Sequence, residues 1–167
     1  HDVIRHATRY ALPQVPTGEY HRLALDWLLR DGTTFEENRE LGTKRARAAI
    51  MMEMALPGSA YVYQGEELGL FEVADIPWDE LEDPSAWRTS RSASTKGRDG
   101  CRVPLPWVAA DAPKLDDPDD EFGHDGSFGF SPADATAEPH LPQPAWYKDF
   151  AVDVESADHD SMLNLYR

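Results

Sequence analysis

Basic residues are scarce in this sequence: 16 Lys and Arg stand against 31 Asp and Glu, which gives a net charge of −15. That balance argues against nucleic acid or an anionic membrane as a partner, because the usual attraction to phosphate groups becomes repulsion. Cys101 is the one cysteine, so an internal disulfide is excluded, and we expect a reducing compartment and a cytoplasmic location. Apolar runs of membrane-spanning length and internal repeats are both lacking. No N-terminal signal segment is visible, but the chain opens at His1 rather than at a methionine, so secretion stays open.

What the sequence does contain is the pattern of one modest α/β domain, for which 167 residues suffice. The clearest strand lies in Leu56–Gly69 (L-P-G-S-A-Y-V-Y-Q-G-E-E-L-G), where an aromatic and β-branched run is bounded by Pro and Gly. Leu41–Leu56, just before it, has the apolar spacing of a helix. A helix, a Pro-Gly stop and a buried strand form half of a βαβ unit and predict a parallel sheet. Tyr20–Leu29 predicts a further helix whose aromatic stripe packs in the core.

Polar residues that could carry chemistry gather in two segments. His1–Pro13 (H-D-V-I-R-H-A-T-R-Y-A-L-P) places two His and two Arg around one Asp. On spacing alone a solvated loop is the more frequent reading, whereas the functional reading is a His-Asp pair that binds neighbouring hydroxyls. Lys96–Trp107 (K-G-R-D-G-C-R-V-P-L-P-W) clusters Arg98, Asp99 and Arg102 in a loop whose Gly and Pro residues fix an unusual backbone path.

Three other segments offer weaker signals. Glu72–Ser94 predicts an irregular loop with a short helix near Asp79–Leu81. The adjacent acids at 66 and 67 invite a general-acid reading, but consecutive strand residues point to opposite faces, so we prefer an ion pair and a solvated carboxylate. Asp111–Asp125 is rich in acids, as calcium sites are, but it lacks the spacing of an EF-hand. We therefore expect neither a metal nor a cofactor.

Three motifs together carry a family resemblance: H-D-V-I-R, L-P-G-S-A-Y-V-Y-Q-G-E-E-L-G and K-G-R-D-G-C-R-V-P-L-P-W, in this order. They closely resemble the later part of the catalytic barrel of α-glucosidases in glycoside hydrolase family 13, the α-amylase family. That group includes oligo-1,6-glucosidase, maltose-acting α-glucosidases and related trehalose- and sucrose-converting enzymes. The resemblance covers nearly the whole chain and is weakest at Ala11–Gly32 and Asp116–Asp125.

The resemblance implies a fold of the α/β class, in which residues 1–167 are the C-terminal portion of a (β/α)₈ TIM barrel. Leu41–Leu56 then matches the seventh helix and Ser59–Gln64 the eighth strand, and a long loop leads to the start of the eighth helix in Asp153–Arg167. His1 and Asp2 would follow the end of the seventh strand, at the barrel edge that carries the active site. The family's aspartate nucleophile and glutamate acid/base precede the His-Asp motif, so the resemblance places both upstream of residue 1.

The resemblance also implies roles for four residues. Asp2 matches the aspartate that stabilises the transition state without a covalent bond, by accepting hydrogen bonds from the 2- and 3-hydroxyls as charge builds on the ring. His1 matches the histidine beside it. Arg98 and Arg102 match the arginines of the family's G-R-D-x-x-R segment, which face the sugar. We expect Arg98 on the hydroxyls of the non-reducing glucose and Arg102 nearer the leaving group.

Two classes of function stay open. The first is a retaining α-glucosidase acting on small α-glucosides or short oligosaccharides; the second is a non-catalytic relative that serves as a partner subunit. An intact Asp2 with Arg98 favours the enzyme, because a scaffold has no need to bind sugar hydroxyls. The sequence does not distinguish hydrolysis from transfer or isomerisation. The linkage preference is also open, and Val3, which stands where some 1,6-specific members carry Gln, favours 1,4-linked substrates. The 167-residue piece alone is expected to be inactive.

Overall fold

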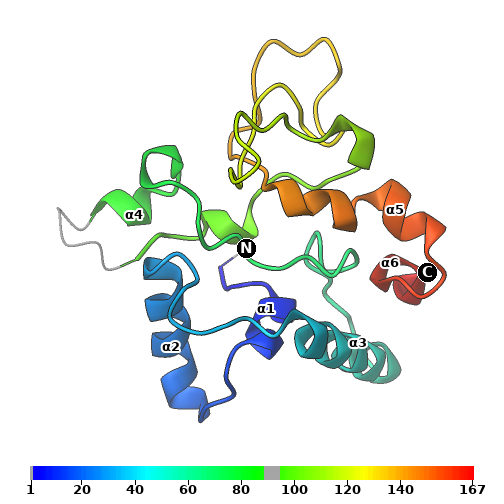
Figure 1. Ribbon diagram of the computed structural model, residues 1–167. Helices are drawn as coiled ribbons and strands as arrows, with labels where there is room; N and C mark the ends of the chain where they lie inside the picture. The colour runs from blue at the N-terminus through cyan, green and yellow to red at the C-terminus, as the bar shows by residue number, and fades with distance from the viewer. Residues whose placement is uncertain (1, 89–94) are drawn as a thin grey trace. The chain divides into compact units, whose positions relative to one another are not determined.

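The structure, a computed structural model, describes residues 2–88 and 95–167 (Figure 1). The chain divides into two compact units: the first comprises residues 1–63 and 71–102, and the second comprises residues 64–70 and 103–167. Within the described residues the regular structure is helical, and β pairing is limited to two isolated bridges in the second unit, Lys114 with His124 and Phe122 with Pro144. No helix in these ranges is long and apolar enough to cross a membrane.

The first unit confirms both helices predicted from periodicity and adds others. Its helical elements are α1 (His6–Ala11), α2 (Thr17–Leu29), α3 (Arg39–Ala55), η1 (Trp78–Glu80), α4 (Pro84–Arg88) and η2 (Asp99–Cys101). The solvated-loop reading of residues 1–13 is wrong for residues 6–11, which form α1 because Ala7, Thr8 and Ala11 are buried against the rest of the unit. The short helix expected near residues 79–81 is confirmed as η1, whereas the end of that predicted loop, residues 89–94, lies outside the described residues.

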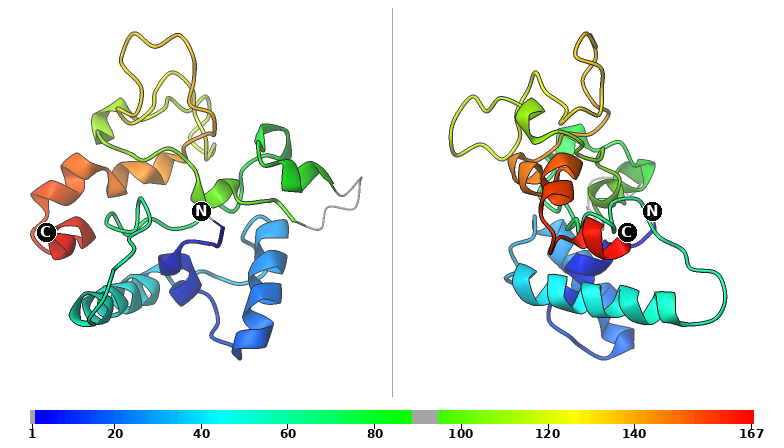
Figure 2. Two further views of the ribbon diagram at one scale, coloured as in Figure 1. Left: turned by 180° about the vertical axis from the view of Figure 1, so that it is seen from behind. Right: turned by 90° about the vertical axis from the view of Figure 1, so that its right-hand side faces the viewer.

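α1 and α3 lie side by side at close range (Figure 2). A Cβ atom on Gly42 of α3 would stand 2.6 Å from the Cβ atom of Ala11 and 2.7 Å from the carbonyl oxygen of Ala7, so a glycine is needed at this crossing. Ala46 and Ile50 are buried as the spacing predicts. Met54, in the last turn of α3, is 53% exposed.

α2 packs its predicted apolar face into the core. Trp27 and Leu28 are buried with Leu12 and Ala74, and Leu23 packs against the edge of this cluster. The indole Nε1 of Trp27 donates to the carbonyl oxygen of Phe35 (3.2 Å). The prediction that this aromatic stripe is core is therefore confirmed.

The strand predicted at Ser59–Gln64 is not formed. Residues 59–63 run without a β partner, and Tyr61 and Val62 are 86% and 42% exposed. A parallel strand exists only through ladder bonds to neighbouring strands, and no described residue supplies such a neighbour. The more specific prediction, a barrel fragment with the end of strand 7 and a complete strand 8, is therefore not confirmed by this structure. The helix expected between those strands is present as α3.

The second unit is mostly irregular, and its sequence is rich in proline. Its helical elements are η3 (Ala109–Asp111), η4 (Ala145–Phe150), α5 (Val152–Ala157) and α6 (Met162–Tyr166). The helix expected near the C-terminal end is thus present in two short pieces, and the hydroxyl of Ser161 caps α6 by accepting from the amide of Asn164 (3.1 Å). The described ranges contain no group of three or more His, Cys, Asp or Glu arranged to bind a metal.

Two adjacent acids, Glu66 and Glu67, lie in a turn rather than at the end of a strand. The carboxylate of Glu67 accepts from the amide of Gly65 (2.8 Å), where the positive φ of 94° suits a glycine. Glu67 therefore stabilises the turn, and the alternating-face argument made for a strand does not apply here.

Candidate functional site

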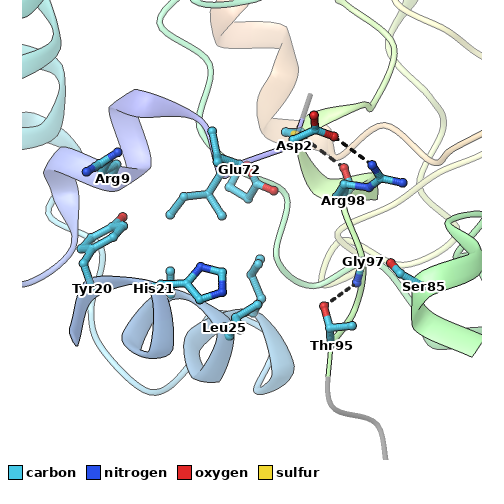
Figure 3. A pocket seen from close by; sticks show the side chains of 15 residues that line it. Asp2, Arg9, Tyr20, His21, Leu25, Glu72, Ser85, Thr95, Gly97 and Arg98 are labelled. Carbon is cyan, nitrogen blue, oxygen red and sulfur yellow. Dashed lines mark hydrogen bonds and ion pairs between the residues drawn. The ribbon is translucent and has the colours of Figure 1, made fainter. Parts of the chain in front are cut away.

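A cavity of about 720 Å³ opens in the first unit. Figure 3 shows Asp2 and Arg98 along one side of it, and Tyr20, His21 and Leu25 of α2 along another. The cavity therefore has a charged wall and a wall made by a helix, both built from the same unit.

The charged wall brings together residues that are 96 positions apart in the sequence. Nη1 of Arg98 donates to Oδ1 of Asp2 at 2.8 Å, and Nη2 of Arg102 lies 3.8 Å from the same oxygen. The side chains of Asp2 and Arg98 are 65% and 42% exposed, so a ligand can reach both. Of the four residues expected at the site, the structure thus brings Asp2, Arg98 and Arg102 together, and His1 lies outside the described residues.

A second carboxylate, that of Asp83, stands behind the two arginines. Its Oδ2 accepts from Nε of Arg98 (2.7 Å) and from the backbone amide of Arg98 (3.0 Å), and it lies 3.7 Å from Nη1 of Arg102. The side chain of Asp83 is 1% exposed. Its hydrogen bond from Arg98 holds the pKa of this carboxyl well below its usual range. Two guanidinium groups thus lie between one buried and one exposed carboxylate.

The loop that carries the arginines is fixed by backbone amides rather than by strand pairing. Oδ2 of Asp99 accepts from the amides of Glu82 (2.7 Å) and Asp83 (2.8 Å), which joins this loop to the segment before α4. Gly97 has a φ of 80°, and a Cβ atom there would lie 2.7 Å from that of Asp83. The glycine in the K-G-R-D motif therefore allows Arg98 to reach Asp83.

Glu72 connects the segment that bears Asp2 to the same loop. Its buried carboxylate accepts from the backbone amide of Arg5 (2.8 Å), and Nη2 of Arg5 in turn donates to the carbonyl oxygen of Cys101 (3.0 Å). Burial raises the pKa of the Glu72 carboxyl from 4.5 to about 7. This buried carboxyl, whose pKa is raised, therefore contacts Arg5. Arg5 follows Asp2 in the chain and contacts the loop that carries Arg98 and Arg102.

Sequence reasoning missed Asp83 and Glu72 as members of this site. Asp83 carried a local signal, because Asp followed by Pro84 is typical of a helix N-cap followed by the first helical position, and Oδ1 of Asp83 does accept from the amide of Ser85 (2.9 Å). Glu72 carried none, because its burial depends on contacts with Arg5 and Thr8 that are 67 and 64 positions away.

The helical wall was not predicted either. Tyr20 and His21 lie on α2 beside Ala24 and Leu28, which also line the cavity, and Figure 3 shows Tyr20 and His21 facing it. The guanidinium of Arg9 lies 4.9 Å from the centre of the Tyr20 ring, and burial raises the pKa of the Tyr20 hydroxyl. These groups offer aromatic and imidazole contacts beside the charged wall.

Comparisons with known proteins point to one family. Residues 28–167 match the family model described as alpha amylase, catalytic domain. The chain is 30% identical over 167 residues to the "Probable alpha-glucosidase" of Rhizobium meliloti, which covers 100% of this chain and 22% of that protein. It is 28% identical over 143 residues to the "Salivary alpha-glucosidase" of Aedes aegypti, covering 85% of this chain and 21% of that protein.

Among solved structures, the alpha-glucosyl transfer enzyme XgtA is similar with a TM-score of 0.56 and 28% identity, over 93% of this chain and 28% of that one. This chain therefore spans about a fifth of the length of the curated relatives that it matches, at 22% and 21%.

Proposed function

The chain belongs to the α-amylase catalytic-domain family, and we propose that it is the C-terminal portion of the catalytic (β/α)₈ barrel of a retaining α-glucosidase. The proposed substrates are small α-linked glucosides and short malto- or isomalto-oligosaccharides. The observation that carries the proposal is the exposed carboxylate of Asp2, held at 2.8 Å by Arg98 at the wall of a cavity large enough for a sugar. The names of the two reported relatives, both α-glucosidases, support the substrate class.

In this proposal Asp2 is the transition-state stabiliser. As the bond to the leaving group breaks, positive charge develops on the glucosyl ring, and the 2- and 3-hydroxyls become stronger hydrogen-bond donors. A carboxylate that accepts from both hydroxyls gains interaction energy as that charge develops, so it lowers the barrier rather than only binding the substrate. Asp2 is suited to this role because its carboxylate is exposed and charged on the cavity side.

Arg98 and Arg102 bind substrate and orient Asp2. The fork of Arg98 already donates to Asp2 through Nη1, so the carboxylate is restrained before the sugar arrives. Nη1 and Nη2 of Arg98 each carry a second N–H, which is the type of donor that hydroxyl oxygens of the non-reducing glucose accept from. Arg102, 3.8 Å from Asp2 and only 27% exposed, is assigned nearer the leaving group, and His1 beside Asp2 completes the substrate-binding set.

The covalent step requires a nucleophile and an acid/base that this proposal assigns to sequence upstream of residue 1. A retaining mechanism uses two carboxyl groups about 5 Å apart, one as nucleophile and one as acid and then base. Asp83 cannot serve as that nucleophile because it is 1% exposed and bonded to Arg98. The 167-residue chain by itself is therefore expected to have no turnover. We place the full-length protein in the cytoplasm.

The test is a product assay on the full-length protein with maltose, isomaltose, sucrose and trehalose. We expect glucose release from at least one of them, and an Asp2→Asn variant should lose several orders of magnitude in kcat with an unchanged melting temperature. Asp79→Asn, at an exposed aspartate of η1, is the matched control and should keep wild-type turnover. Normal turnover by the Asp2→Asn variant would reject the role of Asp2.

The second candidate is a family relative without hydrolase activity, either a partner subunit or an enzyme that transfers or isomerises glucosyl groups. The similarity to an alpha-glucosyl transfer enzyme is the observation that favours the transfer branch. Transfer would appear in the same assay as new oligosaccharides with less free glucose. A full-length protein that lacks the paired nucleophile and acid/base and consumes none of the sugars would support the partner-subunit branch.

A further inference from the structure

Asp83 is a buried carboxylate beside the site, and nothing in the resemblance or the comparisons gives it a role. Both of its oxygens are occupied: Oδ1 accepts from the amide of Ser85 (2.9 Å) and from Nη2 of Arg98 (3.5 Å), and Oδ2 accepts from the backbone amide and Nε of Arg98 (3.0 and 2.7 Å). Arg98 is thus fixed at its backbone and at its guanidinium by the same carboxylate oxygen. Its other end, Nη1, is left directed at Asp2.

From this geometry we propose that Asp83 is a positioning residue, which sets the orientation of the Arg98 guanidinium and thereby keeps Asp2 accessible to sugar hydroxyls. The proposal rests on the function proposed above, since it concerns how Asp2 and Arg98 act together there. Asp83 contacts no substrate in this account and acts only through the two arginines.

The argument depends on the balance of charges. Arg98 and Arg102 both lie between Asp2 and Asp83, at 2.8 and 3.8 Å from the first and 2.7 and 3.7 Å from the second. If the buried carboxylate were absent, two guanidinium groups would have only Asp2 as a charged partner among these four. They would then compete with the sugar hydroxyls for the oxygens of Asp2. Asp83 therefore shares the two cations and leaves capacity on Asp2 for the substrate.

A purely structural role for Asp83 is the alternative, because its Oδ1 caps the first turn of α4. The cap uses Oδ1, whereas the two short bonds from Arg98 go to Oδ2, and Nη2 of Arg98 reaches Oδ1 only at 3.5 Å. This difference separates the two roles experimentally. In an Asp83→Asn variant the single amide oxygen can accept either from Ser85 or from Arg98, whereas the NH₂ group faces donors on the other side. In an Asp83→Ser variant the hydroxyl can cap α4 but is too short and uncharged to fix Arg98.

The experiment is a double-mutant cycle in the full-length protein with Asp83→Asn, Arg98→Lys and the pair, read as kcat/KM on the best α-glucoside. We expect Asp83→Asn and Asp83→Ser each to lower kcat/KM by about 10- to 100-fold, the range of one hydrogen bond between charged groups. Arg98→Lys removes the fork that Asp83 orients, so adding Asp83→Asn to it should lower kcat/KM by less than about twofold. Full additivity of the two effects would overturn the proposal.

Ala86→Gly is the matched control, because it weakens α4 at a buried position without touching either arginine. It should lower the melting temperature while leaving kcat/KM within about twofold of wild type. An equal loss of kcat/KM in Ala86→Gly would show that only the stability of α4 matters, which would also overturn the proposal.

A readout without turnover separates this inference from the function on which it rests. If the wild-type full-length protein consumes none of the glucosides, the proposed function fails, and a crystal structure of the Asp83→Asn variant decides the inference. Departure of the Arg98 guanidinium from its wild-type position would support a positioning role. An Arg98 side chain that stays within hydrogen-bond distance of Asp2 in an unchanged rotamer would refute it.

Discussion

Replacing Glu72 by Gln should change how the stability of the protein depends on pH. Glu72 is buried, with 3% of its surface exposed, and its carboxylate accepts from the amide of Arg5. Gln has nearly the same shape, keeps an oxygen that can accept this hydrogen bond and cannot ionise. The variant therefore removes one titration and leaves the packing nearly unchanged.

The magnitude follows from the pKa of the Glu72 carboxyl, which burial raises from 4.5 to about 7. Between these two values the folded protein holds a proton that the unfolded chain has already released, so unfolding becomes easier as the pH rises. The stabilisation is fully present below pH 4.5, is lost progressively up to about pH 7 and changes no further above it. The total loss in the free energy of unfolding is roughly 3 kcal/mol.

The assay is urea unfolding of wild type and Glu72→Gln from pH 4.5 to 8, with Glu36→Gln at an exposed acid as the control. The two proteins should be nearly equal at pH 4.5, and the Gln variant should be more stable by about 3 kcal/mol at pH 8. Glu36→Gln should follow wild type within about 0.5 kcal/mol at every pH. A constant difference between wild type and Glu72→Gln across this range would refute the reasoning, because it would mean that Glu72 titrates alike in both states.

Two further substitutions test the packing and the charges that support the first unit. Gly42→Ala should destabilise the protein by about 1–3 kcal/mol in urea unfolding, since the new methyl group would overlap Ala11 and the Ala7 carbonyl. Gly18→Ala is the control: a Cβ atom there would have no neighbour within 4 Å, so the change should be neutral or stabilising by less than about 1 kcal/mol. Equal effects of the two would contradict the close crossing of α1 and α3. Lys96→Met should lower the free energy of unfolding by about 1.5–3 kcal/mol, because it removes charged hydrogen bonds to Asp31 (2.6 Å) and to the Ala74 carbonyl (2.9 Å) at a side chain that is 5% exposed. If Lys96→Met destabilised the protein less than Asp31→Asn does, that result would contradict this explanation.

Periodicity predicted the helices of the first unit well because that signal is local. α2 and α3 follow from apolar spacing in their own sequences, and both lie within a few residues of the predicted bounds. Local spacing alone could not predict whether residues 59–64 form a strand, because a strand exists only by pairing with residues elsewhere. The same composition of Ala, Tyr and Val that favours a buried strand here lies largely exposed.

The candidate site was predictable only in part, for a related reason. The proximity of Asp2 to Arg98 was expected from the family resemblance, since no local pattern links residues that are 96 positions apart. The buried partners Asp83 and Glu72 were missed because a lone acid in a sequence is read as solvated. Its burial becomes visible only when the amides that it accepts from are known.

Buried carboxylates explain how this site is built in a unit whose described residues contain no paired strands. Glu72, Asp83 and Asp99 are each at most 3% exposed, and together they accept from the backbone amides of Arg5, Arg98, Ser85, Glu82 and Asp83. These are amides that a sheet would otherwise have to satisfy. The loops around Asp2 and Arg98 therefore depend on three acids rather than on a β ladder. Acids in this chain should accordingly divide into two classes: loss of a buried acceptor leaves one or two amides unsatisfied at about 1–3 kcal/mol each, whereas loss of an exposed one costs little.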